Sequence, residues 1–222
     1  KGDISIVVHP NSHPHDSDLV IMDDCNRVVS FSAHPHQEFE ELKNIVNAAM
    51  YLFNKEALEG YVSSQEKFDI AQDIFPSLIS TGSVIYGYRT VEYLKDMGTP
   101  ERLKVVENDI VMGVCEARSD RVKRRAIFLD RDGTLNVECG YIAASDKLEL
   151  ISQSGEAVKI INKSRYLAVC VTNQPVIARG ECGYKELDAI HGRLDELLGF
   201  DGAYLDSLYF CPHHPDIGYE GE

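Results

Sequence analysis

The sequence of 222 residues lacks any apolar run of the roughly 18 residues that a membrane-spanning helix requires, so we expect no membrane partner. It also lacks positive charge: 22 lysines and arginines stand against 36 aspartates and glutamates, for a formal net charge of -14. Proteins that bind the phosphate backbone of nucleic acids need the opposite balance, so we exclude that class. A small phosphorylated substrate is still compatible with this charge, because a local site and a metal ion can hold it.

The first residues lack the basic segment and apolar core of a secretory signal, and we expect none. The six cysteines are scattered through a chain that is too long for a small disulfide scaffold. Reduced thiols are the default in the cytoplasm, so a cytoplasmic localisation is expected. Internal repeats and low-complexity tracts are absent from the sequence. The length suits one large domain or two modest ones.

Two halves with different patterns follow one another along the chain. Mixed strand and helix signals fill residues 1–117, including a predicted buried strand over 45–53 and a helix over 101–112. Basic residues then mark 118–123, which we interpret as a solvated linker rather than an anion-binding patch. The domain that follows is predicted to cover 124–222.

The second half alternates regularly between strand and helix signals. Strands are predicted near 125–130, 166–171 and 205–210, with helices near 154–164 and 183–198. Such alternation is typical of a Rossmann-like, doubly wound parallel sheet. The predicted fold class is therefore α/β.

The first of these strands ends in two carboxylates, Asp130 and Asp132, which are followed by Gly133 and Thr134. The apolar run before them predicts a strand that is covered on both faces. Open α/β sheets bind ligands at the carboxyl ends of their strands, where both carboxylates fall. One carboxylate can attack a phosphorus atom while the other moves a proton. An acidic turn without a function is the alternative interpretation, and the strand before it and the Gly-Thr after it disfavour that alternative.

The second strand of this half ends in Thr172, Asn173 and Gln174. Because the carboxyl ends of parallel strands lie at the same edge, Thr172 and Asn173 can direct donors at a phosphate above Asp130. Alternatively, the three residues merely open the next loop. Their pairing with the carboxylate motif favours the functional interpretation.

The segments Asp-Arg-Asp-Gly-Thr at 130–134 and Thr-Asn-Gln at 172–174 resemble motifs one and two of the haloacid dehalogenase (HAD) superfamily of phosphohydrolases. Four segments resemble one branch of it closely, namely 128–136, 140–141, 177–180 and Cys-Pro-His-His-Pro at 211–215. That branch contains the D-glycero-D-manno-heptose 1,7-bisphosphate phosphatases and the related histidinol-phosphate phosphatases. The resemblance covers nearly all of the second half.

The resemblance implies a role for each site residue. Asp130 is the nucleophile that forms an aspartyl-phosphate, and Asp132 protonates the leaving sugar oxygen and then activates water. The Asp130 carboxylate and the Asp132 carbonyl hold Mg²⁺, which offsets the charge of the phosphate. Thr172 and Asn173 hold the phosphoryl oxygens. Arg179 binds the other anionic group of a small phosphorylated sugar.

Cys211 and His213 resemble half of a structural Zn²⁺ site in the same branch. A loop cysteine and histidine without metal is the alternative. The resemblance implies a second cysteine pair, a basic third motif and an acidic fourth motif, which we expect downstream of Glu222. On this expectation the 222 residues alone have little phosphatase activity.

The first half contains Asp-Met-Gly-Thr-Pro at 96–100. This segment predicts a turn that caps a helix, with Thr99 as N-cap and Pro100 at the first helical position. It also resembles the D-x-G-T-P motif of sugar-1-phosphate nucleotidyltransferases. The resemblance implies that Asp96 binds a catalytic Mg²⁺ between a nucleotide and a sugar phosphate.

A second segment, Asn-Ala-Ala-Met-Tyr at 47–51, resembles the N-A-G-x-Y strand of the same family, with Ala49 in place of the usual glycine. By this resemblance Asn47 lines the sugar pocket. The glycine-rich nucleotide loop that begins such domains is absent from the sequence. Residues 1–117 therefore resemble the C-terminal part of such a domain, and a nucleoside triphosphate is the expected partner of an intact protein.

Together the two resemblances imply a bifunctional protein of nucleotide-heptose biosynthesis, with a Mg²⁺-dependent phosphatase acting on a heptose bisphosphate. Three alternatives stay open. The first is chiefly a nucleotidyltransferase with an inactive phosphatase, the second is a histidinol-phosphate phosphatase, and the third is a sugar-phosphate-binding protein without catalysis.

Overall fold

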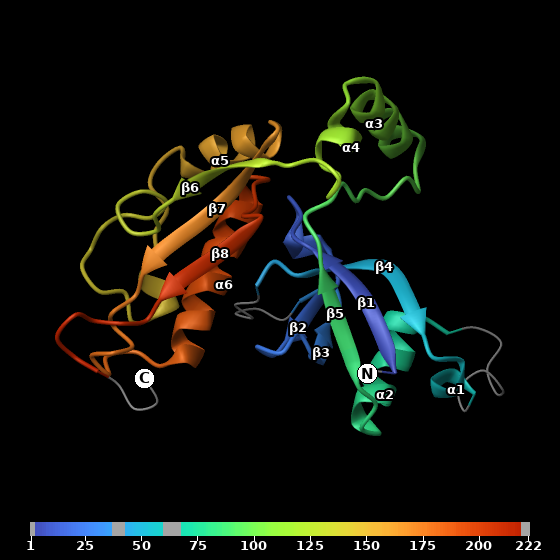
Figure 1. The fold of residues 1–222 in the computed structure, drawn as a ribbon, viewed down its shortest axis with the longest axis horizontal. Coiled ribbons are helices and arrows are strands. Elements are labelled where there is room, and N and C mark those ends of the chain that lie inside the picture. Colours follow the sequence, from blue (N-terminus) through green and yellow to red (C-terminus); the bar gives the residue numbers. More distant parts are fainter. Residues whose placement is uncertain (1–2, 37–42, 60–67, 219–222) are drawn as a thin grey trace.

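The computed structural model describes residues 3–36, 43–59 and 68–218. Two sheets, each with its own apolar core, make up the fold (Figure 1). The α/β class predicted from the sequence is confirmed. Within the described ranges, no helix has both the length and the apolar character needed to cross a membrane.

The first sheet is mixed and has the strand order β3-β2-β4-β1-β5. Its strands are β1 (Ile4–His9), β2 (Leu19–Met22), β3 (Val28–Ser32), β4 (Val46–Phe53) and β5 (Ile85–Arg89). β1 and β5 pair in parallel, whereas β1 with β4, β2 with β3 and β2 with β4 pair antiparallel. The interior strand β1 alternates buried and more accessible side chains, so one face of this sheet holds the core.

A short helical segment covers that face of the first sheet. A π-helical turn, η2 (Ile70–Ile74), leads into α2 (Phe75–Ser80), whose Phe75 and Leu78 are buried in the first core. Helix α1 (Lys55–Leu58) follows β4 and begins at Asn54, whose side chain accepts the Glu56 N–H. A 3-10 turn, η1 (Pro14–Asp16), lies between β1 and β2.

Strand β4 confirms the predicted strand over 45–53 but not its burial. Met50 and Leu52 are 56% and 74% exposed, while Tyr51 and Phe53 pack on the first core. The rings of Tyr51 and Phe53 lie 5.0 Å and 6.0 Å from the ring of Phe75 on α2. One face of β4 therefore packs on α2 and the other meets solvent, because no second layer covers it in the described part of the chain.

Helices α3 (Pro100–Val111) and α4 (Val114–Ala117) end the first half. The Thr99 side chain accepts the Arg102 N–H at 3.3 Å and Pro100 is the first helical residue, so the predicted cap is confirmed. Of the apolar residues at helical spacing, Val106 is 7% exposed, but Ile110 is 60% exposed. Helix α3 therefore packs on the rest of the protein through a narrow apolar stripe that includes Val106.

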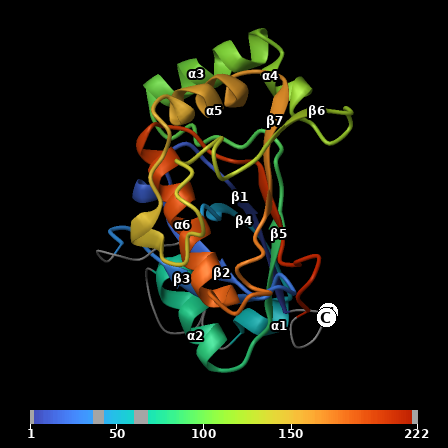
Figure 2. The same cartoon turned by 90° about the vertical axis from the view of Figure 1, so that its left-hand side faces the viewer.

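The second sheet is parallel and has the order β6-β7-β8, with β6 (Arg125–Leu129), β7 (Tyr166–Asn173) and β8 (Ser207–Cys211). Helix α5 (Ser154–Asn162) and helix α6 (Tyr184–Phe200) join these strands, and a 3-10 turn, η3 (Ser145–Lys147), precedes α5. The predicted alternation is confirmed. Because the strands follow one another in order, both right-handed crossovers lie on one face. There α5 and α6 share a single core, and Figure 2 shows both on the same side of β7.

The prediction that β6 is covered on both faces is wrong for the described residues. Phe128 is 71% exposed, and Val171 and Tyr209 on the neighbouring strands are 46% and 59% exposed. Phe128 pairs with Val169, two residues before Val171, so these side chains share the face opposite α5 and α6. A continuous apolar run does not reveal which face a crossover will cover.

The two halves meet along α6. The Asn44 N–H donates to Asp195 Oδ2 at 2.9 Å, and Lys43 Nζ lies 2.7 Å from an Asp188 carboxylate oxygen. A Cβ placed on Gly199 would come within 2.6 Å of the Pro14 ring, so glycine permits the close approach of α6 to η1. These contacts join segments that lie far apart in the sequence.

The predicted linker over 118–123 is less solvated than expected. Arg118 donates to the Asn162 carbonyl at 2.5 Å and to the Tyr204 hydroxyl. Next to the linker, Arg124 donates to the Val91 carbonyl at 2.8 Å. Arginines at both ends of this segment therefore attach it to the two halves, a role that a run of charges in sequence does not disclose.

Asp195 is expected to make stability pH-dependent. Burial raises its pKa to about 6 from 3.8, against the opposing effects of the Asn44 N–H, Arg89 and Lys43. The folded protein then holds a proton that the unfolded chain has lost, so this group's contribution to the free energy of unfolding falls between about pH 4 and pH 6.

In the Asp195→Asn variant, the free energy of unfolding should no longer decrease over this pH range through residue 195. The asparagine amide oxygen still accepts the Asn44 N–H, but the side chain does not ionise. Urea unfolding of both proteins from pH 4 to pH 7 measures the difference. Parallel stability curves across that range would contradict the assignment, and the exposed Asp146→Asn variant serves as the matched control.

Candidate active site

A tight turn follows β6 and holds the two predicted carboxylates. The Arg131 carbonyl accepts the N–H groups of Leu135 at 2.9 Å and Asn136 at 3.1 Å, and the Asn136 carbonyl accepts the Gly133 N–H at 2.9 Å. Gly133 has a φ of 74°, which glycine adopts without strain. Leu135 is 2% exposed and anchors the turn in the core. The turn therefore places Asp130 and Asp132 at the carboxyl end of the sheet.

Asp130 is exposed at this edge, and its Oδ1 accepts the Arg131 N–H at 2.7 Å. That bond orients the carboxylate beyond the end of β6. An exposed, oriented carboxylate at a strand end can approach a phosphorus atom. The geometry is consistent with the nucleophilic role expected from the sequence.

Asp132 lies in a cage of donors that the sequence reasoning missed. Arg131 Nη2 lies 3.1 Å from Oδ1 and 2.9 Å from Oδ2 of Asp132. Gln174 Nε2 donates to Oδ2 at 2.8 Å, and Asn136 Nδ2 donates to Oδ1 at 3.1 Å. Both oxygens are therefore held from two sides, which fixes the direction of this carboxylate. We call Arg131, Asn136 and Gln174 the Asp132 cage.

Arg131 is the centre of this cage and is only 1% exposed. Its Nη2 also donates to Gln174 Oε1 at 2.8 Å. Behind it, His191 is buried, and burial lowers the pKa of His191 to about 3, with a further lowering by Arg131. His191 is consequently neutral, and Arg131 is the positively charged side chain that pairs with Asp132. The sequence signal that could have predicted this role of Arg131 is its position between two aspartates that follow an apolar strand.

The end of β7 lies beside the turn, as predicted. Thr172 and Asn173 pair with Phe210 and Cys211 of β8. Thr172 is 3% exposed, and its Oγ1 accepts Gln174 Nε2 at 3.0 Å. Its hydroxyl thus contacts the Asp132 cage, whereas Asn173 is exposed at the edge. The phosphate-binding roles of both residues remain predictions.

Arg179 lies over the ring of Tyr141, with its guanidinium carbon 4.1 Å from the ring centroid. Its Nη2 lies 3.1 Å from Nε2 of His214. Neither partner is an acidic group, so they orient the guanidinium without neutralising its charge. Such an oriented cation suits a second phosphate of a substrate.

Two metal sites can be compared with the residues present. Mg²⁺ is held in proteins by one or two carboxylates with water and substrate phosphate. The exposed Asp130 carboxylate and the neighbouring Asp132 carbonyl match this oxygen set. Cys211 Sγ and His213 Nδ1 are 3.3 Å apart and supply two soft ligands, half of a tetrahedral Zn²⁺ set. No group of three or more histidine, cysteine or acidic residues suited to a metal occurs in the described part of the chain.

The predicted residues of the first half lie on separate elements. Asn47 is on β4 and donates from Nδ2 to the Tyr51 hydroxyl at 2.9 Å. Asp96 is in the loop before α3, where its Oδ1 accepts the Gly98 N–H at 2.8 Å and its Oδ2 pairs with Arg102. Each side chain has local partners, and their roles toward a nucleotide or sugar remain predictions.

Ala49 occupies a strained position in the segment that resembles the N-A-G-x-Y strand. Its φ is 53°, at a bulge where β1 and β4 shift register. Alanine in this left-handed region costs about 1–2 kcal/mol, and glycine loses about 0.5–1 kcal/mol in chain entropy. We therefore expect Ala49→Gly to raise the free energy of unfolding by about 0.5–1 kcal/mol.

Chemical denaturation measures this change directly. The neighbouring Ala48→Gly variant is the control, and it should lower stability because Ala48 has an ordinary strand conformation. A loss of stability in both variants would show that Ala49 is unstrained.

A model of the nucleotidyl transferase family matches residues 1–112. Among curated proteins, D-glycero-beta-D-manno-heptose-1,7-bisphosphate 7-phosphatase of Haemophilus ducreyi is 42% identical over 94 residues, 42% of this chain and 52% of the relative. The protein of the same name from Escherichia coli K12 is 41% identical over 95 residues, 43% of this chain and 50% of the relative. The chain spans about half the length of the curated relatives it matches. Both resemblances seen in the sequence are confirmed.

Two solved structures are similar at a lower level. The D,D-heptose 1.7-bisphosphate phosphatase from B. bronchiseptica, complexed with magnesium and phosphate, is 30% identical with a TM-score of 0.40, over 44% of this chain and 54% of that one. HddC from Yersinia pseudotuberculosis, complexed with GMP-PN, is 22% identical with a TM-score of 0.38, over 49% of this chain and 44% of that one.

Proposed function

Since the chain belongs to the nucleotidyl transferase family and also resembles heptose bisphosphate 7-phosphatases, we propose that it forms part of a bifunctional enzyme of nucleotide-heptose biosynthesis. Residues 124–222 carry the phosphatase, residues 1–117 the nucleotidyltransferase part, and 118–123 the connection. The substrate of the phosphatase is a heptose 1,7-bisphosphate. The observation that carries this proposal is the pair of differently held carboxylates, an exposed Asp130 and a caged Asp132.

The two carboxylates divide the reaction between them. An Asp130 oxygen forms a bond to the phosphorus of the 7-phosphate while the bond from phosphorus to the sugar oxygen breaks. Asp132 gives its proton to that sugar oxygen. Water then attacks the phosphorus of the aspartyl-phosphate, Asp132 takes the proton, and the bond to Asp130 breaks to release phosphate.

The surrounding residues bind and orient the substrate. Thr172 and Asn173 donate to phosphoryl oxygens, and the oriented Arg179 guanidinium binds the 1-phosphate. Bound Mg²⁺ supplies charge neutralisation at the phosphate, with the Asp130 carboxylate and the Asp132 carbonyl as its protein ligands. Cys211 and His213 contribute two ligands of a structural Zn²⁺.

In the first half, Asp96 binds the Mg²⁺ of nucleotidyl transfer and Asn47 contacts the sugar. The core of this half, to which β1 contributes Ile4, Ile6 and Val8, is separate from the core of the second half. A nucleoside triphosphate and a sugar 1-phosphate are its substrates. The product of phosphatase action, a heptose 1-phosphate, has the chemistry that this half needs.

Phosphate release by the full gene product tests the proposal. With Mg²⁺ present, heptose 1,7-bisphosphate should be hydrolysed with a higher kcat/KM than heptose 7-phosphate or histidinol phosphate. The Arg179→Met variant should lose at least about tenfold in kcat/KM for the bisphosphate, because a charge-assisted contact is worth about 1.5–3 kcal/mol. Arg193→Met, a change at a surface ion pair on α6, is the control.

Two results would overturn the assignment. Faster hydrolysis of histidinol phosphate would identify the related phosphatase activity instead. Nucleotidyl transfer without any phosphate release would leave the protein a nucleotidyltransferase with an inactive second half.

A further inference from the structure

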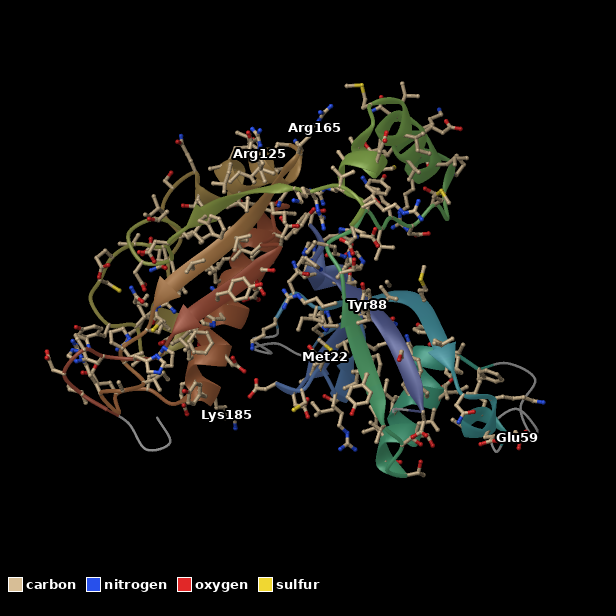
Figure 3. All side chains as sticks on the ribbon, in the orientation of Figure 1. Met22, Glu59, Tyr88, Arg125, Arg165 and Lys185 are labelled. Atoms are coloured by element: carbon tan, nitrogen blue, oxygen red, sulfur yellow. The ribbon has the colours of Figure 1, made fainter. Side chains whose placement is uncertain are left out.

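A cavity of about 570 Å³ opens where α4 meets the amino ends of β6 and β7. Its lining residues come from both sides of the junction between the halves: Gly113, Glu116, Ala117, Val122, Lys123, Arg124, Arg125, Arg165 and Tyr166. Arg125 and Tyr166 are register partners at the start of the parallel strands, and Figure 3 labels Arg125 and Arg165 close together there. Asp130 lies at the other end of β6, about 16 Å away at roughly 3.3 Å per residue. The cavity is therefore separate from the candidate active site.

The cavity is strongly basic in a chain whose net charge is -14. Four of its lining residues are cations, and Glu116 is the one acid among them. Arg124 is only 10% exposed and is engaged with the Val91 carbonyl and Asp120. Lys123, Arg125 and Arg165 are exposed, and none of the three makes an ion pair within the described ranges. Like charges that gather without a partner repel one another, and an anion between them removes that cost.

The remaining wall indicates what kind of anion fits. Tyr166 is 37% exposed and Val122 is 42% exposed, so an aromatic ring and an apolar surface adjoin the cations. A flat ring of a ligand can stack on Tyr166, and Glu116 can accept a hydrogen bond from a sugar hydroxyl. The volume lies in the range of about 300–1,000 Å³ that is typical of small-molecule sites.

We infer that this junction cavity binds a nucleoside diphosphate or a similar ring-bearing organic diphosphate. Its phosphates contact Lys123, Arg125 and Arg165, and its ring stacks on Tyr166. Because the walls come from α4 and from β6 and β7, the bound ligand fastens the second sheet to the helices that end the first half. This inference does not rest on either proposed catalytic activity.

The chain contains no tryptophan, so Tyr166→Trp introduces a single fluorescent reporter into the cavity wall. GDP, ADP and inorganic pyrophosphate are titrated into this variant, and the tryptophan emission is followed. We expect a saturable change with each nucleotide and at least about tenfold weaker binding of pyrophosphate, which lacks the ring. The added Arg125→Gln and Arg165→Gln changes should weaken nucleotide binding by at least about tenfold.

The control carries Lys104→Gln and Lys147→Gln in the same background, which removes the same charge away from the cavity. Both multiple variants are checked for native circular dichroism and unfolding midpoint. If Arg125→Gln and Arg165→Gln prevent folding, Lys123→Gln alone replaces them and should weaken binding severalfold. No emission change at millimolar nucleotide, or equal affinities in the cavity and control variants, would overturn the inference. Equal binding of pyrophosphate and GDP would overturn the stacking of the ligand ring on the aromatic side chain at position 166.

Discussion

Phosphate release from a heptose 1,7-bisphosphate is expected to fall by about 10⁴-fold or more when Asp130 becomes asparagine in the full gene product. An amide oxygen is a poor nucleophile for phosphorus, and the other carboxylate of the motif, Asp132, is held by the Asp132 cage. Asp130 contacts only the Arg131 N–H among the hydrogen bonds of the described residues, so the variant should fold normally. Steady-state phosphate assays with circular dichroism measure both outcomes.

Asp146→Asn provides the matched control for this experiment, since Asp146 is an exposed aspartate of the same half and lies on η3. Its activity should equal that of the unchanged protein. An Asp130→Asn rate within about tenfold of normal would exclude nucleophilic catalysis by this residue.

Arg131→Met should reduce both stability and activity. Removing one member of a buried ion pair costs about 3–5 kcal/mol, because the remaining carboxylate loses its partner in a desolvated place. Asp132 would keep its contacts with Gln174 and Asn136 but lose the group that touches both of its oxygens. Misdirected acid–base catalysis should lower kcat by about 10²-fold or more.

Arg131→Lys separates charge from geometry in the Asp132 cage. Lysine retains the positive charge but not the fork that reaches Asp132 and Gln174 together. We expect its stability and kcat to lie between those of the unchanged protein and Arg131→Met, with an altered pH–rate profile because the carboxylate is held differently. Arg193→Met on the surface of α6 should cost less than about 1 kcal/mol. Equal kcat in all four proteins would show that the cage does not position Asp132.

Much of the fold follows from local patterns in the sequence. Alternating apolar strands and amphipathic helices predicted the order of elements from β6 to β8, and Thr99 with Pro100 predicted where α3 begins. The two aspartates were placed correctly because the end of an apolar strand in a parallel sheet defines an edge of that sheet. Each of these patterns involves residues that are close together in the sequence, so it can be recognised without knowledge of the tertiary contacts.

The features that sequence did not predict depend on contacts between distant segments. The exposure of Phe128 depends on which face of the sheet the two crossover helices cover. The contact between Arg118 and Tyr204 joins residues that lie far apart in the sequence. The Asp132 cage joins the β6 turn to Gln174 after β7, across 42 residues. A motif can identify the members of such a network without revealing which of them touch.

The most direct test of the account is trapping of the covalent intermediate on Asp130. The Asp132→Asn variant of the full gene product is mixed with p-nitrophenyl phosphate and Mg²⁺, because p-nitrophenolate departs without a proton from Asp132. The account predicts a burst of one p-nitrophenolate per active site, slow phosphate release, and a peptide containing Asp130 that gains the mass of a phosphoryl group. Simultaneous release of p-nitrophenolate and phosphate without a burst, or a phosphoryl group on any other residue, would contradict it.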